Sequence, residues 1–337
     1  MVSAGDFVSG YRAYAYYAKA PNFYAFRKAA SNGHLAVMDR LMELAPDKVQ
    51  DMVSEEYFDI FKAAASNGHL AVIDKLIALA PKKAAKDEVI FCAFQWAARN
   101  GHLAVMDRLM ELAPDKVQDM VRMNNFKAFQ EAASNGHLAV MNRLMELAPD
   151  KVQDMVRIKN FNTFREAACN GHLAVMDRLV ELAPDKVQDM VCLADFCAFR
   201  TAAENGHLAV MDRLMELAPD KVQDMVYSGG FYAFRTAAEN GHFAVMDRLM
   251  ELVPDNVQDM VCSDDFYAFR QAAHKGHLLV LEILMTLAPD NVQDMMSVHN
   301  FSALHSVLVK GYFQIVEYVF NFPSVFAHLE MEYNVLT

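Results

Sequence analysis

The chain has 337 residues, of which 54% are hydrophobic and 22% charged, and its formal net charge at pH 7 is −12. This apolar content suffices for an extensive core, which excludes disorder as the main state. The acidic balance leaves no surplus positive field to hold a phosphate backbone, so we expect no nucleic-acid binding. The uncharged stretch from Tyr318 to Leu329 is too short to cross a bilayer, and we expect a soluble chain without membrane insertion.

The cysteines point to the compartment. There are five, an odd number, and no Cys-x-x-Cys pair occurs among them. The pattern therefore indicates neither a disulfide framework nor a structural zinc site. Free thiols fit a reducing compartment, and we expect a cytoplasmic protein.

One pattern recurs along most of the chain. Gly followed by His returns every 35 residues, once after 33, and Gly311-Tyr312 continues the series. A fixed period of this length is the signature of a repeat array. We therefore predict an N-terminal capping segment with a degenerate repeat, nine repeats, and a C-terminal tail or cap, at residues 1–22, 23–322 and 323–337. The recurring glycines are Gly33, Gly68, Gly101, Gly136, Gly171, Gly206, Gly241 and Gly276.

The repeat from Phe196 to Asp224 indicates which elements to expect. Its first helix is predicted by four apolar residues at helical spacing, and it ends near Gly206 because glycine can adopt a positive φ. A second helix follows His207, and its apolar surface is broad enough to pack between two neighbouring repeats. Pro219 ends this helix and begins a third, short helical turn. The apolar residues of the first helix are Phe196, Phe199, Ala202 and Ala203.

Two short helices cannot bury such faces alone, whereas stacked copies can. The sequence thus predicts an all-α solenoid, a curved stack of helix pairs with short helical or irregular fingers. Phe301–His305, FSALH, and Ala202–Val210, AAENGHLAV, resemble the ankyrin repeat. The nine repeats that carry this resemblance span 300 of the 337 residues, from 23 to 322.

The sequence departs from the ankyrin pattern at two places. The Thr-Pro-Leu-His of that family becomes Tyr-Ala-Phe-Arg at Tyr232–Arg235, and Ala218–Gly230 is helix-like where ankyrin repeats have a β-turn finger. The Leu-Ala-Pro-Asp-Lys-Val-Gln run is similar to arrays of bacteria that live inside amoebae and other host cells. That similarity implies a possible bacterial effector in the host cytoplasm.

The residues repeated in every copy indicate a structural role and not metal binding or catalysis. Equivalent histidines on stacked helices lie ~8 to 10 Å apart, too far to share a metal ion with bonds of ~2 Å. The resemblance implies a structural histidine that hydrogen-bonds backbone between repeats. A metal pair at His274 and His277 stays open as an alternative. The methionines are in register with leucines and are predicted to fill the core. No catalytic motif occurs, so we expect no enzyme activity, no cofactor and no metal.

Residues that differ between copies are not required by the core that all repeats share, so they are free to contact a partner. They concentrate in the four residues before each first helix and at its second, sixth and ninth positions, Trp96 among them. In ankyrin proteins the fingers and first helices line the concave binding face, in agreement with this pattern. Neutral drift on a solvated edge is the alternative. The candidate partner-binding residues are the basic Arg122, Lys127, Arg157 and Lys159, and, in the more acidic later half, Tyr227, Tyr232, Asp264 and Tyr267.

These observations predict a non-enzymatic scaffold that binds a partner protein on its concave face. The first alternative is the substrate-targeting portion of a larger host-directed effector or enzyme whose catalytic domain lies outside this chain. The second is a protein that binds a metal or a small ligand through its histidines.

Overall fold

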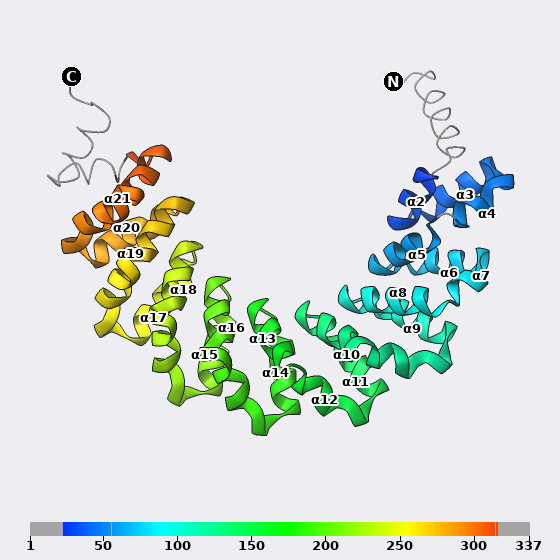
Figure 1. The fold of residues 1–337 in the computed structure, drawn as a ribbon, viewed down its shortest axis with the longest axis horizontal. Helices are drawn as coiled ribbons and strands as arrows, with labels where there is room; N and C mark the ends of the chain where they lie inside the picture. The colour runs from blue at the N-terminus through cyan, green and yellow to red at the C-terminus, as the bar shows by residue number, and fades with distance from the viewer. Residues whose placement is uncertain (1–22, 55, 314, 316–337) are drawn as a thin grey trace, which may run out of the picture. The chain divides into compact units, whose positions relative to one another are not determined.

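The computed structural model describes residues 23–54, 56–313 and 315 (Figure 1). These residues form α-helices joined by short 3-10 turns, so the predicted all-α repeat fold is confirmed. The chain divides into two compact units, residues 1–163 and 164–337. The predicted capping segment at 1–22 and the predicted tail at 323–337 lie outside the described residues, as does most of the last repeat after Phe313.

The first unit contains a series of helix pairs. Its first helices α5, α8 and α10 pack side by side, and the second helix α6 contacts α9 (Figure 1). The elements are α2 Tyr24–Ser31, α3 Leu35–Leu44, η1 Pro46–Lys48, α4 Val49–Ser54, α5 Tyr57–Ser66, α6 Leu70–Leu79, α7 Pro81–Ala84, α8 Asp87–Arg99, α9 Leu103–Leu112, η2 Pro114–Lys116, α10 Val117–Ser134, α11 Leu138–Leu147, η3 Pro149–Lys151 and α12 Val152–Arg157.

The second unit repeats the same pairs. It begins within α13 Asn162–Cys169, and its helices α15, α17, α19 and α21 pack in succession. The other elements are α14 Leu173–Leu182, η4 Pro184–Lys186, α15 Val187–Glu204, α16 Leu208–Leu217, η5 Pro219–Lys221, α17 Val222–Glu239, α18 Phe243–Leu252, η6 Pro254–Asn256, α19 Val257–Lys275, α20 Leu278–Leu287, η7 Pro289–Asn291 and α21 Val292–Val309.

Each first helix ends at the predicted glycine. Gly101 has a φ of +78°, and the amide of His102 then donates to the carbonyl of Ala97 at 2.9 Å. This closes the end of α8 in the manner of a left-handed C-terminal cap. The chain reverses there, and the second helix α9 begins at Leu103.

Each second helix leads into the predicted third helical turn. Ala218 leaves the helical region with φ −141° and ψ 67°, which suits a residue before proline. Pro219–Lys221 then forms a 3-10 turn, and Val222 starts an α-helix. The helical finger predicted for this segment is confirmed.

A left-handed turn separates this short helix from the next first helix. In α17, Gly229, Gly230 and Phe231 all have positive φ, so the ribbon is kinked there. The same turn occurs at Ala194–Phe196, which means that Phe196 precedes the regular helix instead of belonging to its first turn. We call the segment from each 3-10 turn through this left-handed turn the finger.

The third repeat has a different finger. It is two residues shorter in sequence, and α7 is followed by Lys86 in an extended conformation. Helix α8 then runs without a kink from Asp87 to Arg99. The missing residues therefore remove the left-handed turn and lengthen the first helix.

The core contains the residues that the repeats share. Phe94, Phe129, Phe199 and Phe234 are each at most 1% exposed, and the alanine pairs that follow them are fully buried. Met38 in the second helix α3 and Met52 in the finger helix α4 are fully buried, which confirms their predicted role in the core, whereas Met42 is only half-buried. Buried positions thus repeat with the sequence period.

Replacement of Phe129 by alanine should lower the free energy of unfolding by ~3 to 5 kcal/mol, because a fully buried ring is lost and a cavity remains. Denaturant unfolding of the whole chain measures this. Lys127→Ala, on the same helix and half-exposed, is the matched control and should change stability by about 0.5 kcal/mol or less. Equal losses from both substitutions would mean that the two faces of this helix are assigned the wrong way round.

Candidate binding face

Arg122 and Lys127 lie on either side of the left-handed turn in α10. Arg122 is half-exposed, and its Nη2 lies 3.7 Å from a carboxylate oxygen of Asp150 in the next finger. Lys127 pairs with Glu131 at 2.6 Å, and Arg99 approaches the other oxygen of Glu131 at 3.7 Å. The two predicted residues are therefore solvent-facing cations with a local carboxylate partner.

Arg157 and Lys159 occupy the next finger. Both are exposed, and Lys159 begins the left-handed turn with a φ of +46°. Within the part of the chain that the structure describes, neither side chain has an ion-pair partner. Their charges are thus open to solvent, and they increase the positive charge of the finger edge of the first unit.

Tyr232 and Tyr267 link neighbouring repeats of the second unit. The hydroxyl of Tyr232 donates to Glu204 at 3.2 Å, and that of Tyr267 donates to Glu239 at 2.8 Å. The guanidinium of Arg235 lies 5.2 Å from the Tyr267 ring centre. The hydroxyls of both tyrosines therefore have partners, and arginine guanidinium groups lie over both rings.

This pairing affects ionisation. Burial, the hydrogen bond to Glu239 and the charge of that carboxylate raise the pKa of Tyr267 to about 12. Burial opposes the ionisation of Glu239, but hydrogen bonds from Lys275 and Tyr267 outweigh it and lower the pKa of Glu239. The carboxylate is therefore held as an anion between two donors.

Tyr227 and Asp264 lie in fingers of the second unit. Tyr227 is 39% exposed and donates from its hydroxyl to Asn256 at 2.8 Å, while its ring meets the edge of Phe231. Asp264 is more than half exposed and forms an ion pair with Arg235 of the preceding repeat. Tyr227 therefore connects one finger to the next, Asp264 connects its finger to the preceding first helix, and both present part of their side chain to solvent.

The sequence pattern missed the residues that hold the left-handed turns. Arg200, Arg235 and Arg270 follow the turns at the same repeat position and donate to carbonyl oxygens within them at 2.8 to 3.2 Å. Gln130 does the same in the first unit at 2.6 Å. Their recurrence four residues after the shared Phe was the available signal, although the turn that they cap was not foreseeable.

The repeated histidines are structural, as the resemblance implied. A ring nitrogen of His102 lies 3.0 Å from the carbonyl oxygen of Ser66 in the preceding repeat. Burial lowers the pKa of His137, despite its hydrogen bond to backbone. Among the described residues, no group of three or more His, Cys, Asp or Glu is placed to hold a metal ion, and the pair His274 and His277 has no third ligand there.

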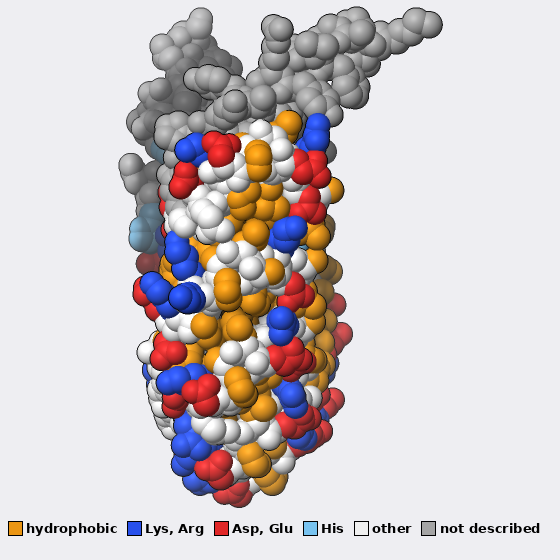
Figure 2. Space-filling view, turned by 90° about the vertical axis from the view of Figure 1, so that its right-hand side faces the viewer, with side chains coloured by type: hydrophobic (Ala, Val, Ile, Leu, Met, Phe, Trp, Pro, Cys, Tyr) orange, Lys and Arg blue, Asp and Glu red, His pale blue; other side chains and the backbone are white. Residues whose placement is uncertain are grey.

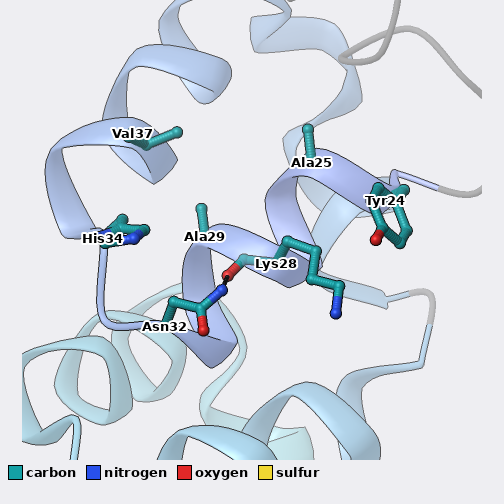
Figure 3. A pocket seen from close by; sticks show the side chains of 7 residues that line it. All are labelled: Tyr24, Ala25, Lys28, Ala29, Asn32, His34 and Val37. Carbon is teal, nitrogen blue, oxygen red and sulfur yellow. Dashed lines mark hydrogen bonds between the residues drawn. The ribbon is translucent and has the colours of Figure 1, made fainter.

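The face of α2 and α3 has a shallow pocket of about 360 Å³ (Figure 3). Figure 3 shows His34 and Val37 on one side of it and Tyr24 and Lys28 on the other. Val37 is 37% exposed, whereas Val72 at the equivalent position of the next repeat is 1% exposed because a preceding helix pair covers it. The pocket is therefore a repeat-packing surface and offers no catalytic arrangement of side chains.

The surface carries charges of both signs. Figure 2, which looks onto the side where α4 and α7 lie in Figure 1, shows hydrophobic side chains along the middle and charged ones along both borders. Lys and Arg alternate with Asp and Glu on each border. Mixed charge of this kind suits a protein partner better than a phosphate backbone, which binds to clustered positive charge.

The five cysteines are free thiols, as predicted. Burial raises the pKa of Cys92, Cys169, Cys192 and Cys262. These thiols therefore stay protonated near neutral pH, which argues against a reactive nucleophile among these four. The described residues also contain no helix with the length and hydropathy of a bilayer-spanning segment.

Comparison with known proteins finds similarity to solved structures. No protein-family model and no curated protein matches the chain. Among solved structures, an ankyrin repeat family protein from Legionella pneumophila is 25% identical, and the match covers 74% of this chain and 77% of that chain with a TM-score of 0.38. The helices themselves show the architecture, which is an array of repeated helix pairs.

The left-handed turns should respond oppositely to two substitutions. Ala194→Gly should raise the free energy of unfolding by about 1 kcal/mol, because its φ of +49° strains an L-residue. Gly230→Ala should lower it by a similar amount, and a new Cβ there would meet no atom within 4 Å, so only the backbone strain is measured. Denaturant unfolding tests both. The same sign of change for the two variants would contradict the left-handed turn.

The hydroxyl of Tyr267 should make stability depend on alkaline pH. Its pKa is about 12 in the folded chain and about 10 in an unfolded chain, so the unfolded state loses the proton first. Its stabilisation is complete below pH ~10 and is lost as pH rises towards 12. Unfolding measured across this interval should therefore be steeper for the wild type than for Tyr267→Phe. Identical slopes would mean that Tyr267 titrates normally.

Proposed function

We propose that this chain is a non-enzymatic scaffold that binds a partner protein on the face formed by its fingers and first helices. Ankyrin-like arrays are generally interaction modules, which supports the coarse assignment. The observation that supports this face is the separation of constant from variable residues. Within the finger, a constant position is buried and a variable position close to it is exposed or half-buried, so variation at the second position does not disturb the core.

Two positions of the finger illustrate the separation. One position holds Met in successive repeats, and these side chains are at most 1% exposed. The position two residues later holds Arg, Cys, Tyr or Ser, and its side chains are exposed or half-buried. The constant residues are Met120, Met155, Met190, Met225, Met260 and Met295, and the variable ones are Arg122, Arg157, Cys192, Tyr227, Cys262 and Ser297.

The charge of the fingers differs between the two units. Arg122, Arg157 and Lys159 are exposed cations of the first unit, whereas Asp195, Asp264 and Asp265 are exposed anions of the second. Complementary charges on a partner would fix the direction in which it lies along the chain. A cytoplasmic site of action, and the role of a secreted effector or of a targeting portion within a larger effector, stay predictions from the sequence.

The test uses a partner captured by the intact chain and then purified. Substituting Arg122, Arg157 and Lys159 together by Gln should weaken its affinity by ~2 kcal/mol or more if either arginine is an interface hot spot. The dependence of affinity on salt should also become weaker, because fewer charges are paired across the interface.

The matched control carries Arg40→Gln, Arg108→Gln and Arg143→Gln on the second helices α3, α9 and α11. It removes the same charge, and the exposed ion pairs of these arginines contribute ~1 kcal/mol or less each to stability. We expect it to bind the partner normally. If the control loses binding and the finger variant retains it, the second helices carry the function and the proposal is wrong.

A further inference from the structure

Trp96 is the only tryptophan of the chain, and it lies on the surface of α8. Its side chain is 36% exposed. The equivalent residues of the neighbouring repeats are Ala63 and Glu131, so the repeat fold does not require a large ring at this position. Tryptophan is enriched among the residues that dominate binding energy at interfaces.

Two cations border this ring. The guanidinium of Arg99 lies 5.2 Å from the ring centre of Trp96, within the range of a cation–π contact. Arg99 and Lys127 approach opposite oxygens of the same carboxylate, Glu131, at 3.7 and 2.6 Å. Glu131 is only 18% exposed, whereas the two cations are 47% and 46% exposed. The largely buried carboxylate of Glu131 therefore pairs with two half-exposed cations, and these three side chains together carry one net positive charge.

The neighbouring finger increases this positive charge. Lys82 and Lys86 are exposed on the shortened finger of the third repeat. Lys86 lies ten residues before Trp96, which corresponds to ~15 Å along a helix and to about five residues of extended chain. Of the two carboxylates that follow Lys86, Asp87 pairs with Lys116 at 3.5 Å and Glu88 is exposed, so the finger has two exposed lysines and one carboxylate outside this pair. A short peptide segment can thus reach from the indole to the lysines.

We propose that Trp96, Arg99 and Lys127 form the principal anchor for an acidic segment of the partner protein. One apolar side chain of the segment packs on the indole ring, and carboxylates beside it pair with Arg99 and Lys127. This inference depends on the proposed function, since it assigns a chemistry to part of the same face. A phosphate backbone is disfavoured because the chain has a net charge of −12 and Glu131 stands between the two cations.

The experiment selects binders of the full chain from a random twelve-residue peptide library that lacks tryptophan. Recovered peptides should be enriched in Asp and Glu next to one apolar residue. Because Trp96 is the only tryptophan, its fluorescence reports contact directly, and each peptide should shift the emission of the wild-type chain. Anisotropy of the fluorescein-labelled peptides gives their dissociation constants for the variants.

Trp96→Ala and the pair Arg99→Gln with Lys127→Gln should each weaken peptide binding at least 10-fold, and Trp96→Phe should weaken it less. The control pair Arg108→Gln with Arg143→Gln removes the same charge from the second helices and should bind as the wild type does. Circular dichroism and thermal melting verify that each variant is folded. If Trp96→Ala does not fold, the variant with Arg99→Gln and Lys127→Gln still tests the proposal.

Five results would overturn the inference. Recovered peptides without acidic enrichment would do so, as would peptides whose affinity is unchanged in both anchor variants. Tighter binding of a ten-nucleotide single-stranded DNA, lost in the same variants, would assign the cluster to phosphate instead. If peptides bind through Arg122, Arg157 and Lys159 but not through the anchor, the proposed function stands and only this inference is wrong. Binding lost only in the control pair would contradict both.

Discussion

The close contact between the glycine of one repeat and the histidine of the next is the constraint on which the array depends. Gly101 has a φ of +78°, and a Cβ there would lie 2.5 Å from a ring nitrogen of His137. Gly33, Gly68, Gly206 and Gly241 meet the next histidine in the same way. The backbone turn that ends each first helix therefore also sets the distance to the following helix pair. Where Tyr312 replaces the histidine, its hydroxyl lies against Gly276 and donates to the Gly276 carbonyl oxygen, so the contact between the repeats is kept.

This constraint, together with the buried Phe and Met residues, leaves the outer positions of the first helices and fingers free to differ. In the second unit these positions form links between repeats: tyrosine hydroxyls donate to glutamates, and arginines lie over the tyrosine rings. In the first unit they include exposed cations and the single tryptophan. The same backbone fold therefore presents a surface of linked tyrosines, glutamates and arginines in the second unit and a surface of exposed cations in the first. The two surfaces differ in side chains that are not part of the core.

The sequence predicts the helix pairs well because their signals are local and repeated: apolar spacing, a glycine stop and a proline start. It does not predict the left-handed turns. Lys159 and Ala194 adopt positive φ there although neither residue favours it, so tertiary packing and the donors from Arg200 and its equivalents override local preference. For the candidate face, six of the eight residues singled out from the sequence are exposed, and Tyr232 and Tyr267 are half-buried. It does not reveal that the Tyr232 and Tyr267 hydroxyls are already paired, because the partners are one repeat away.

A double-mutant cycle on Gly101 and His137 tests the contact between repeats most directly. Gly101→Ala should destabilise the chain both by strain at positive φ and by collision with the imidazole. His137→Ala removes the ring and therefore the collision, so the account predicts that the double variant loses clearly less stability than the sum of the single variants, by 0.5 kcal/mol or more. Additive losses, measured by denaturant unfolding, would mean that the two residues do not couple, and would contradict the claim that this contact sets the spacing of the repeats.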